Sequence, residues 1–388
     1  MLTDRIKQKF LSEFHKEPEF IVRSPGRVNL IGEHTDYNEG FVLPAAIDKS
    51  IYLGFSRNQD NVCRVCSLDF AETDQFYLDQ LAPRMGGWLN FIMGVADQFQ
   101  KRGMELGGFD CVFGGDIPIG AGLSSSAALE NGVGMGLARL FGHAVNKATL
   151  IQISQKAEHE FAGVQCGIMD MFASMMGKKD LAIRLDCRSM EHAYFPLNLG
   201  SYQFLLLDTK VTHSLGDSEY NNRKEECEIG IAYLQQRFPS VKSLRDVTVP
   251  MLQGAIGEIS PTVWNRCSYV VEENERLLKA CDCLENADLA GFGDLMYGSH
   301  NGLRQKYEVS CPELDFLVDF TLDRVDVLGA RMMGGGFGGC TINLIATESV
   351  DNFVKKAQKA YLNQMGRQLS AYTVNISNGT EIVEKAMN

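Results

Sequence analysis

Hydrophobic spacing near the N-terminus predicts one helix followed by several short strands. The apolar residues that recur every four positions, with Lys and Glu between them, are Ile6, Phe10 and Phe14. This period predicts an opening helix. The apolar run 20–22 predicts a strand, which the residues 24–26 (Ser-Pro-Gly) should end. The apolar stretches within 41–55 predict two short strands, and 62–67 predicts another.

An unusual helix is predicted after a strand at 109–113 and a loop of Gly, Pro and Ser that runs to Ser126. The helix covers 127–141 and is rich in small residues, namely Ala127, Ala128, Gly132, Gly134 and Gly136. Glycine lowers helix propensity. We therefore expect another backbone to approach this helix closely.

The same patterns continue to the C-terminus. A helix is predicted at 147–161, and a short helix should end near Gly177. The elements predicted beyond these are a strand at 204–207, a charged helix at 219–238, helical segments at 270–283 and 288–300, and a glycine-rich turn into a strand at 334–345. Alternating strands and helices predict an α+β or α/β architecture, with a boundary between two lobes near residue 200.

Length, charge and composition argue against several classes of function. The chain has 388 residues, which suits two domains of roughly 100–200 residues each. Its net charge of −12 argues against non-specific attraction to nucleic acid or to an anionic membrane. No apolar run approaches the roughly 20 residues that span a bilayer, and the first residues lack the apolar stretch of a secretory signal. We expect a cytoplasmic protein that acts on a small molecule.

The cysteines do not predict a disulfide framework. There are 11, an odd number, in a chain much longer than disulfide-stapled scaffolds. Only Cys63 and Cys66 have the spacing of a metal-binding pair, and no second pair or histidine partner follows. Two buried thiols on a strand are the favoured interpretation over a zinc site.

The strongest local motif lies between the predicted strand at 109–113 and the small-residue helix. It reads Gly-Asp-Ile-Pro-Ile-Gly-Ala-Gly-Leu-Ser-Ser-Ser-Ala-Ala over 115–128. Glycines allow a sharp turn and close approach to a ligand, and a helix start offers free N–H groups to an anion. Three hydroxyls could cap the helix, bind phosphate oxygens or ligate a metal. A serine-capped helix after a glycine turn is the alternative without a ligand.

Other nucleotide and hydrolase motifs do not fit. A Walker loop needs a Lys that is absent here, and a nucleophile elbow begun at Gly122 would need glycine at Ser126. Protein-kinase signatures are missing. A second glycine run, 334–339, has the spacing of a dinucleotide fingerprint but precedes a strand and not a helix. We expect it to serve close backbone packing near the first loop.

A second motif, residues 24–37, carries polar groups suited to a sugar. Glu33 and Asp36 place two carboxylates beside His34 in one turn-like segment. Carboxylates accept several hydrogen bonds, as vicinal hydroxyls require. A surface turn with solvated charges, or a metal site whose other ligands are not evident, would also fit these residues.

Together, 27–37, 120–128 and 334–339 resemble the GHMP small-molecule kinases, and 32–37 (Gly-Glu-His-Thr-Asp-Tyr) is similar to the galactokinases among them. The resemblance covers nearly the whole chain. It implies the α+β GHMP fold, with a lobe similar to ribosomal protein S5 over 1–200 and a ferredoxin-like lobe over 201–388. The sugar segment and the phosphate loop would belong to the first lobe and the glycine-rich turn to the second. The active site would lie between the lobes.

The resemblance also implies the binding residues. The sugar would contact Glu33, His34, Thr35 and Asp36, together with Tyr220 from a further similar block at 211–223. ATP would be held by the phosphate loop, which comprises Gly120, Ala121, Gly122, Leu123, Ser124, Ser125 and Ser126, with Ser67 touching the nucleotide. Mg²⁺ would be ligated by Ser126 and Glu158, since this cation takes few protein oxygens beside phosphates and waters.

Catalysis would rest on Asp170 and Arg27. A carboxylate can accept the proton of an anomeric hydroxyl, and a guanidinium can stabilise a transferring phosphoryl group. Asp170 could equally be an orienting charge, because phosphoryl transfer needs little early proton removal. Met171 stands where the family usually has Gln.

The implied reaction is ATP-dependent phosphorylation of the anomeric hydroxyl of galactose, the first committed step of galactose catabolism. Two alternatives stay open from the sequence. One is a kinase for a related sugar, such as N-acetylgalactosamine or arabinose. The other is a non-catalytic sensor of galactose and ATP, which the intact Ser-Ser-Ala-Ala of 125–128 disfavours. The expected partners are these small molecules alone, and the expected state is a monomer.

Overall fold

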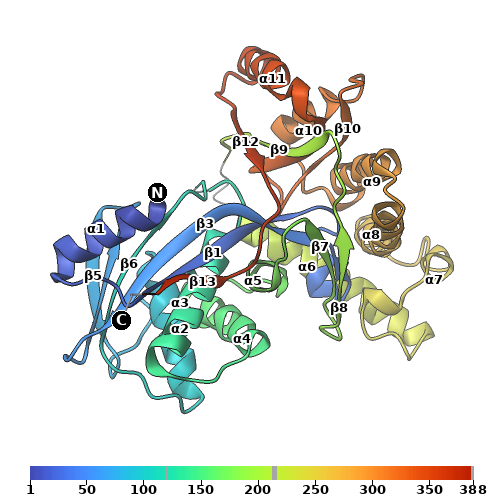
Figure 1. Ribbon diagram of the computed structural model, residues 1–388. Helices are drawn as coiled ribbons and strands as arrows, with labels where there is room; N and C mark the ends of the chain where they lie inside the picture. The colour runs from blue at the N-terminus through green and yellow to red at the C-terminus, as the bar shows by residue number, and fades with distance from the viewer. Residues whose placement is uncertain (119, 212–215, 386–388) are drawn as a thin grey trace.

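The computed structural model describes residues 1–118, 120–211 and 216–385, which form two lobes around three β-sheets (Figure 1). The α+β class is as predicted. Within these ranges, no helix is both long and apolar enough to cross a membrane.

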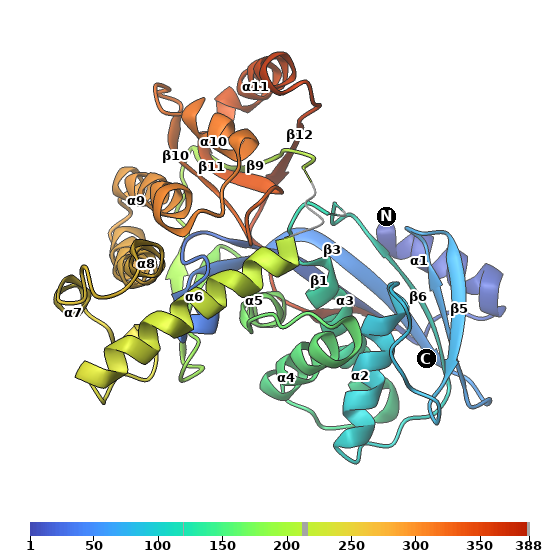
Figure 2. The ribbon, with the colours of Figure 1, turned by 180° about the vertical axis from the view of Figure 1, so that it is seen from behind.

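The N-terminal sheet has six strands in the order β13-β1-β3-β6-β4-β5. Their bounds are β1 (Phe20–Asn29), β3 (Pro44–Arg57), β4 (Val62–Ser67), β5 (Glu72–Tyr77), β6 (Phe109–Gly115) and β13 (Glu381–Lys385). One face carries α1 and the other carries α2 to α5 (Figures 1 and 2). These helices are α1 (Leu2–Phe14), α2 (Leu89–Lys101), α3 (Ser125–Phe141), α4 (Lys147–Ala157) and α5 (Met169–Met176).

Alternation along β4 explains the two cysteines. Cys63 belongs to the core under α2 and α3, whereas Cys66 packs with Ile6 and Phe10 of α1 on the opposite face. Residues three apart on a strand point to opposite sides of a sheet. The pair therefore cannot bind one ion together, and both are buried free thiols as the sequence indicated.

The predicted end of the first strand at 24–26 is wrong. β1 continues to Asn29 and pairs with β3 throughout, with a register shift between Pro25 and Arg27. β13 pairs with β1 only over 20–23, so Pro25 lies where one edge of β1 has no strand partner among the described residues. Proline is tolerated at such edges and bulges. The continuation places Arg27 on a rigid strand.

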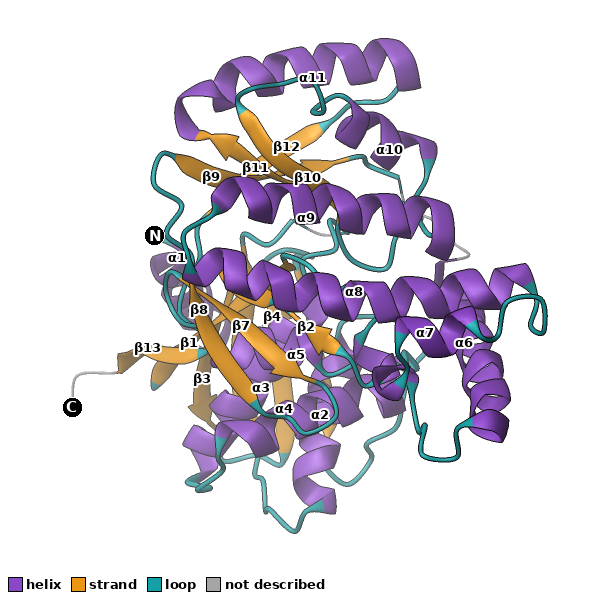
Figure 3. Cartoon of the chain, turned by 90° about the vertical axis from the view of Figure 1, so that its right-hand side faces the viewer, coloured by secondary structure: helices purple, strands orange, loops and turns teal. Residues whose placement is uncertain are grey.

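The C-terminal lobe is built on a four-stranded sheet in the order β10-β11-β9-β12. Its strands are β9 (Tyr202–Asp208), β10 (Val327–Met332), β11 (Cys340–Ala346) and β12 (Ser370–Val374). Leu205 and Leu207 face α10 (Pro312–Asp319) and α11 (Val350–Met365), whereas Phe204 and Leu206 share a core with α9. This alternation makes a sheet covered on both faces (Figure 3).

Long helices join the lobes. α8 (Pro261–Glu285) lies between α9 (Leu289–Gly302) and the third sheet (Figure 3). That sheet has the order β2-β7-β8 and comprises β2 (Phe41–Val42), β7 (Leu181–Asp186) and β8 (His192–Pro196). The remaining helices of this region are α6 (Gly216–Arg237) and α7 (Val249–Gln253).

The last strand crosses the boundary predicted near residue 200. β13 leaves the C-terminal lobe and pairs with β1, and Ser24 Oγ lies 2.9 Å from Thr380 Oγ1 at the crossing. The C-terminal sheet does begin directly after residue 200, with β9. The division into 1–200 and 201–388 stays a prediction from the sequence.

The small residues of α3 do allow close approach, although by side chains of the sheet. A Cβ at Gly132 would collide with Leu53, and one at Gly136 would collide with the ring of Phe55. Gly134 faces Leu150 with a separation of 3.5 Å, which is ordinary contact. Two of these glycines are therefore required by packing on β3, and Gly134 is not.

This difference predicts opposite effects of the same substitution within one helix. Gly136→Ala should lower the free energy of unfolding by about 1–3 kcal/mol, because the methyl group overpacks the core. Gly134→Ala should raise it by up to about 1 kcal/mol, because alanine favours helix over glycine. Urea unfolding of both variants measures the effects, and equal values would contradict the packing described here.

Candidate active site

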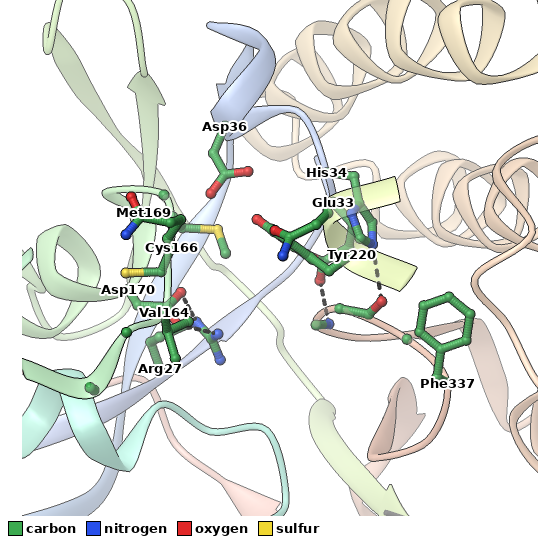
Figure 4. Close-up of a pocket in the computed structure, with 18 residues that line it drawn as sticks. Arg27, Glu33, His34, Asp36, Val164, Cys166, Met169, Asp170, Tyr220 and Phe337 are labelled. Atoms are coloured by element: carbon green, nitrogen blue, oxygen red, sulfur yellow. Dashed lines mark hydrogen bonds and ion pairs between the residues drawn. The ribbon is translucent and has the colours of Figure 1, made fainter. Parts of the chain in front are cut away.

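A cavity of about 410 Å³ lies where the two lobes meet (Figure 4). Its walls come from the two halves of the chain. The lining residues are Arg27, Glu33, His34, Asp36, residues 162–167, Met169, Asp170, Tyr220 and Asn221 of α6, and residues 334–337. The sugar motif, the segment that carries Asp170 and the glycine-rich turn, which are distant in sequence, therefore share one cavity.

Arg27 and Asp170 form a two-pronged ion pair at this cavity. Arg27 Nε lies 2.7 Å from Asp170 Oδ1, and Nη2 lies 2.7 Å from Oδ2. Arg27 projects from β1 and is nearly buried, while Asp170 lies in the first turn of α5. Burial alone would lower the pKa of Arg27, but Asp170 outweighs burial and the pKa is raised. The two parallel hydrogen bonds thus fix the geometry of the pair.

The phosphate loop is tied to this pair. Arg27 Nη1 donates to the carbonyl of Gly122 (2.6 Å), and Ser124 Oγ donates to Asp170 Oδ2 (2.5 Å). Gly120, Gly122 and Ser124 have positive φ, so the loop turns sharply before α3 begins at Ser125, two residues earlier than predicted. The first N–H groups of the helix are left for an anion.

Ser126 and Glu158 are brought together as the resemblance implied. Ser126 Oγ donates to Glu158 Oε1 at 3.0 Å. Glu158 begins a π-helical turn (Glu158–Ala162) that replaces the end of the helix predicted over 147–161. Burial, and next the charge of Asp170, raise the pKa of Glu158.

One hydroxyl and one carboxylate are a donor set that suits Mg²⁺, which keeps waters and phosphate oxygens as its other ligands. In the described part of the chain, no three His, Cys, Asp or Glu side chains gather into a metal cluster. The residues present therefore fit a magnesium ion shared with a nucleotide.

Glu33 enters the cavity wall held by the opposite lobe. Its Oε1 accepts the N–H of Gly334 (2.8 Å) and lies 3.1 Å from Nη2 of Arg331 on β10. The side chain is only 3% exposed, and that remainder faces the cavity. The glycine-rich turn was expected to pack near the first loop. It closes mainly on Glu33 and His34, although Cys340 Sγ does donate to Ala121 O (3.1 Å).

His34 is a neutral ring with a definable tautomer. Burial lowers its pKa to about 3. Nε2 lies 3.2 Å from the carbonyl of Gly335, which can only accept, so Nε2 carries the proton. Nδ1 then accepts from the hydroxyl of Tyr37 (2.8 Å), and Tyr37 in turn accepts from Tyr307 (2.7 Å).

Tyr220 extends this aromatic group toward the cavity. Its ring centroid lies 5.5 Å from that of His34 and 5.1 Å from that of Tyr37. The block 211–223, from which Tyr220 was predicted, lies partly outside the described residues, at 212–215. Tyr220 itself lines the cavity as predicted.

Asp36 faces the cavity across from Asp170 (Figure 4). Gly167 leaves the space for it, because a Cβ there would overlap Asp36 Oδ2. Burial raises the pKa of Asp36 to about 6, and the charges of Asp170 and Glu33 act in the same direction. Asp36 is therefore a carboxylate that becomes charged within the cavity near neutral pH.

Among the predicted site residues, the phosphate loop 120–126, Glu158, Thr35 and Ser67 do not line this cavity, and the last two use their side chains inside the fold. Thr35 is fully buried, and its hydroxyl lies 2.9 Å from the carbonyl of Gly32 and 2.5 Å from that of Phe41. Ser67 is also fully buried and accepts the N–H of Phe70 (3.3 Å). The side chain of Thr35 closes the sugar turn, and that of Ser67 closes the end of β4, so neither lines the cavity.

Met171, the departure from the family pattern, is fully buried in the core below α5. Its carbonyl accepts from Asn131 Nδ2 (2.9 Å), and it does not line the cavity. The substitution thus replaces an amide by an apolar side chain beneath Asp170.

Arg331 is a residue in contact with the site that the sequence interpretation missed. It stands in the apolar strand β10, three residues before Gly334. A signal was present, because a charge inside an apolar strand needs a buried partner. The identity of that partner, 298 positions away in the chain (331 − 33), could not be read from the pattern.

Three family descriptions match the chain. They are the galactokinase galactose-binding signature over residues 8–57, the GHMP kinase N-terminal domain over 90–178 and the GHMP kinase C-terminal domain over 268–364. The first includes the sugar motif, the second the phosphate loop, Glu158 and Asp170, and the third Arg331 and the glycine-rich turn.

Similar proteins of known name agree with these matches. A galactokinase of Clostridium acetobutylicum is 41% identical over 98% of this chain and 99% of its own, and one of Roseiflexus is 39% identical over 97% and 96%. The crystal structure of Lactococcus lactis galactokinase complexed with galactose superposes with a TM-score of 0.95, at 34% identity over 99% of this chain and 100% of its own. A mevalonate kinase (TM-score 0.66, 18% identity, 92% and 99% coverage) shares the fold.

The raised pKa of Asp36 predicts how stability depends on pH. Unfolded Asp titrates near about 3.9, so the folded protein binds the extra proton between about pH 4 and 6 and loses stability as that proton leaves. Asp36→Asn removes this loss. Its gain in melting temperature over the parent protein should be small near pH 4, grow to about pH 7 and then stay constant.

Asp246→Asn is the matched control for this measurement. Hydrogen bonds from Arg188 lower the pKa of Asp246 to about 2, so its stabilisation is complete above about pH 4 and disappears as pH falls toward 2. This variant should lose stability by a constant amount at pH 5–8. An Asp36→Asn gain that does not change with pH would contradict the assigned titration.

Proposed function

The chain belongs to the galactokinase family of the GHMP kinases, and we propose that Asp170 and Arg27 perform its ATP-dependent phosphorylation of galactose in the cavity between the lobes. The observation that carries this assignment is their two-pronged ion pair, tied to the phosphate loop through Gly122 and Ser124. The ion pair thereby links the cavity proposed for the sugar to the loop proposed for the phosphates.

The proposed transfer moves the γ-phosphoryl group to the anomeric oxygen. The hydroxyl loses its proton, its oxygen bonds to phosphorus, and the bond from phosphorus to the bridging oxygen of ADP breaks. Three donors, two from Arg27 and one from Ser124, fix the direction of the Asp170 carboxylate. We therefore assign Asp170 first to orienting the hydroxyl, with proton acceptance late in a loose transition state.

Arg27 supplies the positive charge on the other side of this step. Two of its nitrogens are held by Asp170 and the third by Gly122, so the guanidinium cannot rotate away. A fixed charge beside the phosphorus stabilises the negative charge that develops on the transferring group without reorganisation. Lysine could not make these three directed bonds.

Galactose recognition is assigned to the wall opposite Arg27. Glu33 and Asp36 offer carboxylate oxygens to sugar hydroxyls. His34, whose two ring nitrogens are engaged by Gly335 and Tyr37, offers its ring surface beside that of Tyr220. The phosphates of ATP are assigned to the loop and the start of α3, and Mg²⁺ to Ser126 and Glu158. When bound, the cation would neutralise phosphate charge. The cytoplasmic location and monomeric state stay predictions from the sequence.

Replacing Asp170 tests the assignment. Asp170→Asn should lower galactose-dependent ADP release by about 10²–10⁴-fold, the range of positioned acid–base groups, while the fold is retained by circular dichroism. A rate within a few-fold of the parent protein would remove Asp170 from the mechanism.

Asp246→Asn is again the matched control, since it breaks a comparable two-pronged pair, with Arg188 (2.8 and 3.0 Å), outside the cavity. Its ADP release should be unchanged. The same assay distinguishes the kinase from the sensor alternative, because a sensor would bind galactose but the parent protein would then release no ADP.

A second variant tests the magnesium site. Glu158→Gln should raise the Mg²⁺ concentration for half-maximal rate by at least about tenfold and weaken Mn²⁺ binding in the presence of ADP, measured by electron paramagnetic resonance. Glu160→Gln, two residues away and paired with Lys101, should change neither value. Unaltered Mn²⁺ binding by Glu158→Gln would exclude Glu158 as a ligand.

A further inference from the structure

The end of β10 supplies two contacts to one oxygen of Glu33. Arg331 Nη2 lies 3.1 Å from Glu33 Oε1, and three residues later the N–H of Gly334 donates to the same oxygen at 2.8 Å. Among the described residues, no hydrogen bond engages Oε2, and Oε2 is not one of the buried atoms without a partner. Oε2 is therefore the oxygen that Glu33 presents to the cavity.

Arg331 has no other carboxylate partner in the described chain. It is fully buried, and its one hydrogen bond to a described residue is donation by Nη1 to the carbonyl of Asn29 (2.9 Å) on β1, so that its contact with Glu33 is an ion pair without a directed hydrogen bond. A guanidinium cannot shed its proton, so a buried one requires a fixed anion nearby. Conversely, Arg331 and the N–H of Gly334 limit the Glu33 side chain to one orientation.

The backbone around Glu33 is held by different residues. Tyr269 of α8 donates to the carbonyl of Glu33 (3.0 Å), and the N–H of Gly32 donates to Glu273 Oε1 (2.9 Å). The turn is thus anchored by α8, while the Glu33 carboxylate is aimed by β10. A change at Arg331 can release the side chain and leave the turn in place.

We propose that Arg331 is a positioning residue for the sugar, which aims Glu33 Oε2 into the cavity from the opposite lobe. The inference rests on the proposed function of the cavity and adds to it a residue that touches neither substrate nor cofactor. Arg331 contacts none of Arg27, Asp170, Ser126 or Glu158 in the described structure. Its effect should therefore fall on galactose and not on ATP.

Kinetics of two variants test this effect. Arg331→Met should raise the KM for galactose by at least about tenfold and leave the KM for ATP within about twofold, since only sugar contacts are weakened. Arg331→Lys keeps the positive charge but loses the planar guanidinium group, so it should give a KM for galactose between those of the parent protein and Arg331→Met. The shift in melting temperature caused by saturating galactose should shrink in the same order.

Arg324→Met is the matched control. Arg324 precedes the other end of β10 and also has one carboxylate partner, Asp326 (2.8 Å), far from the cavity lining. It should lose stability without change in either KM. A galactose KM within about twofold of the parent for folded Arg331→Met, or an equal rise in Arg324→Met, would overturn the positioning role.

A double-mutant cycle with Glu33→Gln completes the test. If Arg331 acts through Glu33, then Arg331→Lys should raise the galactose KM much less in the Glu33→Gln background than alone. Full additivity would overturn the proposal, and this arm does not require Arg331→Met to fold. Absence of galactose turnover in the parent protein would instead refute the proposed function, so the two failures are distinguishable.

Discussion

The ion pair between Arg27 and Asp170 is the constraint on which the site depends. It joins β1 to the start of α5, and Ser124 and Gly122 bind the phosphate loop to the same two side chains. Arg27 is nearly buried and Asp170 is half-buried, and a buried guanidinium would lose its solvation without compensation if the carboxylate were removed. The requirement to pair them therefore fixes the strand, the helix and the loop relative to one another.

A second buried ion pair, Glu33 with Arg331, connects the two lobes. Three carboxylates, of Glu33, Asp36 and Asp170, line the cavity, and two of them are paired, Asp170 with Arg27 and Glu33 with Arg331. Asp36 has no such partner among the described ion pairs, and burial accordingly raises its pKa to about 6. The two paired carboxylates are held in place by their partners, whereas the unpaired one has the raised pKa.

His34 is neutral because it is buried and lies near positively charged residues. A cationic ring beside Arg331 and Arg223 would be repelled, and burial penalises it further, so the pKa falls to about 3. The ring then needs one donor and one acceptor, which Tyr37 and Gly335 provide. An aromatic group with defined hydrogen-bond directions results, and it forms the sugar side of the cavity.

The sequence by itself determined the class of fold, most elements, the phosphate loop and the sugar motif, because periodicity, glycine turns and helix starts are local properties. It also indicated Asp170, Glu158 and Tyr220, but only through resemblance to a family. Tertiary structure alone decided that β1 passes through Pro25, that Thr35 and Ser67 turn inward, and that Arg331 pairs with Glu33. Those outcomes depend on which residues distant in sequence come into contact, and on which side chains become buried when the sheets and helices pack. No local pattern of residues specifies either.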